Sequence, residues 1–144
     1  RHLDQSFEIF RANRHRRGEG NVYTIRGALH LDRGELDKAE DVGRLAYELG
    51  EEKKDRILMA RGRILQCMVE NAKVEEGIFD HNPDQHARLA FQYAMEALES
   101  ARLTENQRLL ARAYIWQGLT LCNDLFYNPD AARDCCDKAA ALVK

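Results

Sequence analysis

Small residues recur at helical spacing along most of this sequence, and this feature limits the fold more than any other. Between residues 27 and 47, two amphipathic runs flank a turn centred on Gly34. The second run carries Ala39, Gly43 and Ala46, whose i, i+4, i+7 spacing places them on one helical face. Such a stripe lets a neighbouring helix approach closely, because no long side chain separates the two axes. The stretch therefore predicts a tightly packed helix pair.

The same stripe returns further along the chain. Its full recurrences are Ala90, Ala94, Ala97 and Ala132, Cys136, Ala139, and an incomplete one begins with Ser6 and Phe10. A polar residue followed by glycine precedes each full stripe, as Arg26-Gly27, Arg61-Gly62 and Gln117-Gly118. Recurrence at such intervals indicates a repeat of helix pairs. We therefore expect an all-α fold.

Composition agrees with one helical domain over residues 1–144. Residues are 44% hydrophobic and 32% charged, which argues against disorder. The formal net charge of −2 gives no overall attraction to nucleic acid or anionic membrane. No apolar run approaches the ~20 residues that a membrane span needs. We expect a cytoplasmic protein with four reduced cysteines. Because the chain starts at Arg1, we also expect it to be a fragment of a longer protein.

About seven helices are expected. They cover about residues 3–13, 22–32, 35–49, 52 into the 70s, 83–102, 104–125 and 128–144. Asn82-Pro83 and Asn128-Pro129 are start signals, with asparagine as the cap and proline in the first turn. Thr104 and Gln107 match a capping box. Residues 15–21 (HRRGEGN) are expected to form a turn.

The helices group into a half repeat and three repeats of unequal length. The expected bounds are 1–17, 18–50, 51–103 and 104–144. The second repeat carries about 16 extra residues near 69–85, because Gly62 and Ala90 lie farther apart than the corresponding pairs. Such an insertion forms a loop or a longer helix on one face. Its Ile78, Phe79 and His81 favour packing back onto the body.

The pattern resembles the tetratricopeptide repeat, especially the longer-period variety of kinesin light chains and of bacterial regulators of the maltose-activator and Rap types. The resemblance covers nearly the whole chain. It rests on the stripes, on segments 16–40 and 105–132, and on Tyr23 and Tyr114, which stand four residues before their glycines. The residue before each glycine departs from the family's Leu, and no proline closes the repeats. The resemblance implies a right-handed α-α superhelix of antiparallel helix pairs.

A fold of this kind binds partners, because stacked pairs form a curved ridge. In the family, the first helix of each pair lines a concave groove that usually holds a peptide or a partner helix. By position, the groove residues would be Asn21, Thr24, Arg56, Met59, Arg63, Gln66, Arg112, Trp116 and Asn123, with Ile25 and Ile115 beside them. Arginines near a tryptophan would suit an acidic segment with an apolar anchor. Trp116 is equally compatible with a core position against Leu119. Some members of the family hold a peptide carboxylate with particular Lys and Asn residues. Those residues are not found in this sequence, which disfavours the binding of chaperone tails.

No pattern for catalysis, for a cofactor or for a metal is found. GxSxG, HExxH and phosphate-binding glycine loops are missing. His81 and His86 do not lie squarely on one helical face, and no Cys or His group has zinc spacing. The arginines of residues 11–17 fit a solvated turn better than a nucleic-acid patch. We expect no catalytic residue, no cofactor, no metal, and no nucleic-acid or membrane binding by this segment.

Three functional hypotheses follow. The leading one is a non-catalytic protein–protein interaction module, acting as a scaffold or regulatory segment of a larger protein. The alternative is a ligand- or peptide-sensing segment of a bacterial signal-responsive transcription regulator. A third is self-association through end repeats, whose apolar faces normally meet a neighbouring repeat.

Overall fold

The chain forms a row of packed helices. The computed structural model describes residues 2–12, 16–77, 82–123 and 125–143, and these residues contain helices and turns but no strand. The helices are α1 (His2–Ala12), α2 (Arg16–Asp32), α3 (Leu36–Lys53), α4 (Arg56–Glu76), α5 (Pro83–Arg102), α6 (Gln107–Leu121) and α7 (Pro129–Leu142). The predictions of an all-α fold and of seven helices are confirmed.

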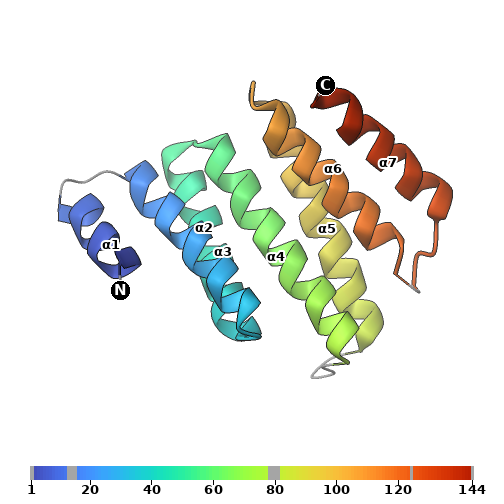
Figure 1. Ribbon diagram of the computed structural model, residues 1–144, viewed down its shortest axis with the longest axis horizontal. Coiled ribbons are helices and arrows are strands. Elements are labelled where there is room, and N and C mark those ends of the chain that lie inside the picture. Colours follow the sequence, from blue (N-terminus) through green and yellow to red (C-terminus); the bar gives the residue numbers. More distant parts are fainter. Residues whose placement is uncertain (1, 13–15, 78–81, 124, 144) are drawn as a thin grey trace.

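Each helix packs against the next one in the chain, and α1 and α7 lie at opposite ends of the long axis (Figure 1). Among the described helices, the further contacts join α2 with α4 and α4 with α6. These three helices therefore form one continuous layer, and α3 and α5 lie behind it (Figure 1). Because α4 touches four other helices, it is the central element of the molecule.

The two asparagine–proline start signals act as predicted. The Asn82 side chain accepts a hydrogen bond from Asp84 N at 3.0 Å, and Asn128 accepts one from Ala131 N at 3.1 Å. Proline follows in the first turn of α5 and of α7, where its missing N–H leaves no hydrogen bond unmade. Gly34 forms the turn between α2 and α3 with a φ of 74°, a conformation that glycine adopts without strain.

The predicted capping box is wrong. Asn106 caps α6, because its side chain accepts a hydrogen bond from Leu109 N at 3.0 Å. The Thr104 hydroxyl instead donates to Ala101 O at 2.7 Å and thereby closes the end of α5. Asparagine is a stronger cap than threonine, and threonine can bond back to a carbonyl of the preceding turn.

Three predicted boundaries also differ. The segment expected to be a turn is helical from Arg16 onward, while residues 13–15 lie outside the described part. Its glycines lower helix propensity by about 1 kcal/mol each but remove no hydrogen bond. Helix α3 continues through Gly50 to Lys53, because Gly50 is buried against Met59 and serves close packing. Helix α6 ends at Leu121, where Asn123 accepts hydrogen bonds from the backbone of Leu125 and Phe126.

The extra residues of the middle segment lengthen the helices. Helix α4 has 21 residues and α5 has 20, so they are the longest of the seven described helices. Residues 78–81, which include the predicted packing residues Ile78, Phe79 and His81, lie outside the described part of the chain.

The small-residue stripes face inward. Ala39, Ala46, Ala90, Ala94 and Ala97 are completely buried. In the last stripe, Ala132 and Ala139 are buried as expected, but Cys136 is exposed and Cys135 takes the buried position. An i, i+3, i+7 spacing fits a helical face as well as i, i+4, i+7 does.

A very close helix contact joins α3 to α4 at Gly62. A methyl group at this position would lie 2.7 Å from Tyr47 N and 2.8 Å from Gly43 O, which are backbone atoms that cannot rotate away. The two helices can therefore approach this closely only with glycine here.

We predict that Gly62→Ala lowers the free energy of unfolding by about 1–3 kcal/mol, because overpacking must push α3 and α4 apart. This is a net loss, since the overpacking must first cancel the gain of about 1 kcal/mol that alanine brings to a helix interior. Gly118→Ala in α6 is the matched control, because its added methyl would meet the nearest atom, Ala132 O, at 3.2 Å. Urea unfolding measures both variants. A Gly62→Ala protein as stable as wild type would contradict the prediction.

Candidate functional site

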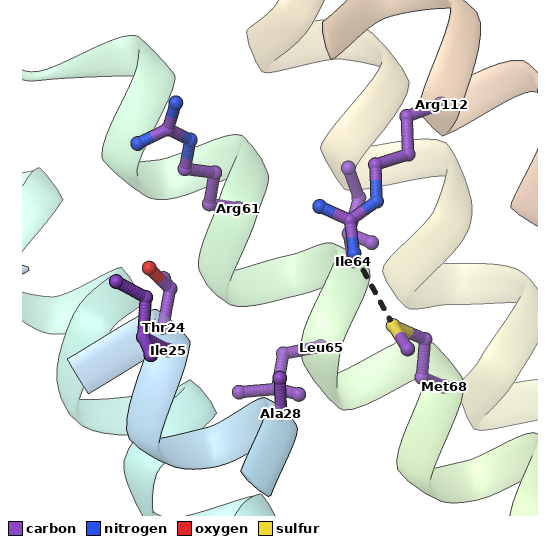
Figure 2. Close-up of a pocket in the computed structure, with 8 residues that line it drawn as sticks. All are labelled: Thr24, Ile25, Ala28, Arg61, Ile64, Leu65, Met68 and Arg112. Carbon is purple, nitrogen blue, oxygen red and sulfur yellow. Dashed lines mark hydrogen bonds between the residues drawn. The ribbon is translucent and has the colours of Figure 1, made fainter. Parts of the chain in front are cut away.

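A pocket of about 450 Å³ opens on the layer formed by α2, α4 and α6. We call it the arginine pocket. Its walls are Thr24, Ile25 and Ala28 from α2, Arg61, Ile64, Leu65 and Met68 from α4, and Arg112 from α6 (Figure 2). Segments that are far apart in the sequence thus border one depression.

The floor of the arginine pocket is apolar. Ile64 and Leu65 are almost fully buried beneath it, and Met68 is half-buried at its edge. Ile25 of α2 is 52% exposed, which is high for an isoleucine. The pocket therefore offers apolar surface to a ligand as well as charge.

Arg112 carries the charge on the α6 side. Its Nη2 atom donates to the Met68 sulfur at 3.9 Å (Figure 2). Among the described residues, no carboxylate pairs with Arg112. Burial, and then the nearby positive charge of Arg61, lower the pKa of Arg112 below its ordinary value. An arginine remains charged under these conditions, so the pocket has an excess of positive charge.

A second pocket of about 510 Å³ lies farther along α4 and α6. We call it the tryptophan pocket. Its lining residues are Asn71, Val74, Glu75, Trp116, Leu119, Cys122 and Asn123. Trp116 is half-buried, packs against two core clusters and also lines this pocket. One part of Trp116 thus packs in the core and another faces the pocket, and its role as an anchor for a partner stays a prediction.

The structure divides the predicted groove residues among several places. Thr24 and Arg112 line the arginine pocket, and Trp116 and Asn123 line the tryptophan pocket. Arg56 and Met59 border a different, shallow depression of about 360 Å³ beside Glu51 and Lys54, at the turn between α3 and α4. The side chain of Asn21 lies outside the described part.

Arg63 and Gln66 point to the opposite side of α4, toward α3 and α5. The Arg63 guanidinium lies 3.4 Å from the centre of the Tyr47 ring and forms an ion pair with Glu96 at 2.5 Å. Gln66 is 2% exposed, and it accepts a hydrogen bond from Arg63 and donates one to Glu40. The structure therefore does not bring these two residues to the groove.

A shift of helical register explains this difference. Gly118 of α6 meets the following helix α7, whereas Gly62 of α4 meets the preceding helix α3. The small residue of α4 that faces the following helix is Cys67, which packs with Ala90 and Ala94 of α5. Gly62 and Cys67 are five positions apart, which is a rotation of about 140° around the helix axis. The prediction places Arg63 and Gln66 in the groove by their distance along the sequence from Gly62. Because Gly62 faces α3, this assignment selects residues on the side of α4 that faces away from the pockets.

Sequence reasoning missed the α4 wall of the arginine pocket, above all Arg61. With Cys67 as the reference, Arg61 stands six positions before it, as Arg112 stands six before Gly118. The match of these two arginines is the signal in the sequence that could have corrected the register.

A cluster of buried charges lies behind α4. His86 Nδ1 is 2.6 Å from Glu70 Oε2, Lys73 Nζ is 3.6 Å from Glu70 Oε1, and all three residues are buried. This pairing ties α5 to α4, since buried charges are stable only when they are paired. The cluster has a structural role, because it faces away from both pockets.

The Cys67 thiol is buried and unsuited to act as a nucleophile. Burial raises the pKa of the Cys67 thiol to about 11, which keeps it protonated and unreactive. No three His, Cys, Asp or Glu side chains gather as metal ligands would in the described ranges.

No known family model, curated protein or solved structure matches this chain. None of the helices in the described part combines the length and the apolarity needed to cross a bilayer.

We predict that Glu40→Gln stabilises the fold at pH 7. Glu40 Oε2 is buried without a hydrogen-bond partner, and burial, opposed by the hydrogen bond from Gln66, raises the pKa of this carboxyl above 4.5. The folded state thus holds the proton more tightly than the unfolded chain, so wild-type stability falls as the pH rises from 4.5 through the folded pKa. Glutamine keeps the acceptor for Gln66 and removes the buried charge.

Thermal unfolding between pH 3.5 and 8 tests this. The gain from Glu40→Gln should be largest at neutral pH and vanish below 4.5. Asp41→Asn, an exposed neighbour on α3, should change stability by less than about 0.5 kcal/mol. A gain that does not depend on pH would refute the assignment of its cause to the Glu40 charge.

Proposed function

We propose that this chain is a tetratricopeptide-like protein-interaction module without catalytic activity, and that the face of α2, α4 and α6 is its binding groove. Support comes from the row of helices, the buried small-residue stripes and the two pockets on one layer. In a stacked array of this kind, the first helices of successive pairs share one face, as these three helices do.

The register of the helices supports an internal repeat. Gly27, Cys67 and Gly118 are small residues on α2, α4 and α6, and counting back six positions from each gives Asn21, Arg61 and Arg112. Counting back two gives Ile25, Leu65 and Trp116, which all line pockets on the groove face. The position two before the small residue thus lines a pocket in each of the three helices.

The observation that carries the proposal is Arg112, exposed above an apolar floor with no carboxylate partner among the described residues. A cation in this setting favours a ligand that brings both an acidic group and an apolar side chain. An acidic segment of a partner protein with an apolar anchor fits the arginine pocket. Arginine beside apolar surface is also a common centre of binding energy in protein interfaces.

A ligand-sensing segment is the second candidate. Both pockets fall within the range of about 300–1,000 Å³ that is typical of small-molecule sites. This alternative requires a ligand that stabilises the isolated chain, since binding to the folded state alone raises its stability. Thermal unfolding with a metabolite library distinguishes it from partner binding.

Self-association through α7 is less favoured. The exposed positions of α7 include Asp130, Arg133, Asp134, Asp137 and Lys138. A helix face that carries this many charges is better suited to water than to an apolar interface. Light scattering over a range of concentrations tests this hypothesis.

We predict that peptides selected from a phage-displayed library of random 12-residue sequences are enriched in acidic residues next to an apolar one. Arg112→Glu should weaken their binding by tenfold or more, a loss of about 1.4 kcal/mol. Fluorescence anisotropy at 50 and 200 mM salt measures this, and binding to the wild type should weaken at the higher salt.

The matched control is Arg108→Glu, because Arg108 is an exposed arginine on α6 that lines neither pocket. It should leave the affinity unchanged. Selection of no peptide, or of peptides that bind the Arg112→Glu variant equally well, would sink the proposed groove.

A further inference from the structure

We propose that the tryptophan pocket binds a basic side chain, lysine or arginine, of the same partner segment whose acidic residue occupies the arginine pocket. This inference rests on the proposed function. It adds a basic residue to the acidic and apolar residues already proposed for the partner segment. It follows from the charges, the amide orientation and the spacing of the two pockets.

The tryptophan pocket carries the opposite charge to the arginine pocket. Glu75 is its only charged lining residue, it is exposed, and no cation pairs with it among the described residues. The Trp116 indole lines the same depression. A carboxylate together with an indole is a combination that attracts a cation, by charge and by the cation–π interaction.

The orientation of Asn71 adds an acceptor to this pocket. Its Nδ2 atom donates to Cys67 O at 3.1 Å and to Thr120 Oγ1 at 2.9 Å. A carbonyl can only accept, so these bonds fix which end of the amide is the nitrogen. The Oδ1 atom is therefore left as an acceptor, and no donor among the described residues uses it. An ammonium or guanidinium group supplies such donors.

Asn123 forms the other polar part of the wall. Its Oδ1 atom is held by the backbone N–H groups of Leu125 and Phe126, and its Nδ2 atom is buried without a hydrogen-bond partner. Neither polar atom is therefore presented to a ligand, so Glu75, Trp116 and Asn71 are the residues that would recognise the basic side chain.

The spacing of the pockets sets the ligand's sequence pattern. Along α6, Arg112 and the middle of the tryptophan pocket wall are separated by about eight residues, which is about 12 Å at 1.5 Å per residue. An extended peptide covers about 3.3 Å per residue. The acidic and the basic residue of the ligand should therefore stand about four positions apart, with the apolar anchor near the acidic one.

The test uses the phage-displayed library described above, selected in parallel on the wild type, on Glu75→Gln and on Glu76→Gln. Glu76 is an exposed carboxylate in the same last turn of α4 that does not line the pocket. It therefore controls for effects on the helix end. Peptides from the wild-type selection should pair an acidic with a basic residue about four positions away.

Replacing that basic residue with glutamine should weaken binding to the wild type and to Glu76→Gln about tenfold, but should weaken binding to Glu75→Gln clearly less, because only the Trp116 ring and the Asn71 oxygen then contact the cation. Quenching of Trp116, the only tryptophan, reports occupancy of this pocket. Selected peptides that are acidic but lack the basic residue would overturn this inference and leave the arginine pocket intact. Loss of all selection on the wild type would overturn both proposals.

Discussion

The approach of α3 and α4 at Gly62 is the contact on which the rest of this structure depends. A methyl group added at Gly62 would lie less than 3 Å from backbone atoms of α3. The two helix axes are therefore closer than any side chain larger than that of glycine permits here. This contact fixes how closely α4 packs on α3, and α4 in turn contacts α2 and α6. Because the three helices share one layer, Arg61 and Arg112 can border a single pocket although they are far apart in the chain.

The same central helix separates two kinds of polar surface. On its rear face, Arg63 contacts Tyr47 of α3 and Glu96 of α5, and Glu70 pairs with Lys73 of the same helix and with His86 of α5. These side chains are largely buried. On its front face, Arg61 and Glu75 border open pockets. Burying the rear charges costs desolvation that the pairing offsets, so these residues specify how α3, α4 and α5 fit together. Of the two front-face residues, Glu75 has no cation partner among the described residues.

Much of the fold could be predicted from the sequence, because helix periodicity, asparagine caps and the Gly34 turn are local signals. Helix ends were harder, since Gly50 lies inside a helix for a packing reason that only the tertiary structure reveals. Of the residues predicted for a groove, Thr24 of α2 and Arg112 of α6 line the arginine pocket, whereas Arg63 of α4 points to the opposite side, toward α3 and α5. Gly62 faces the preceding helix α3, whereas Gly118 faces the following helix α7. Both are simply glycines in the sequence, so a sequence pattern cannot distinguish the two orientations.

Two pockets of opposite charge on one layer give the proposed groove a direction. At physiological ionic strength the screening length is about 8 Å, which is shorter than the distance of about 12 Å between the pockets along α6. In the proposed groove, each pocket would therefore select its own side chain with little influence from the other, and the order of charges in a ligand would matter more than its net charge. A chain with a net charge of −2 has no strong long-range field to guide partners. Recognition at this face would then depend on short-range fit, which is why the Asn71 orientation and the apolar floor matter as much as the charges.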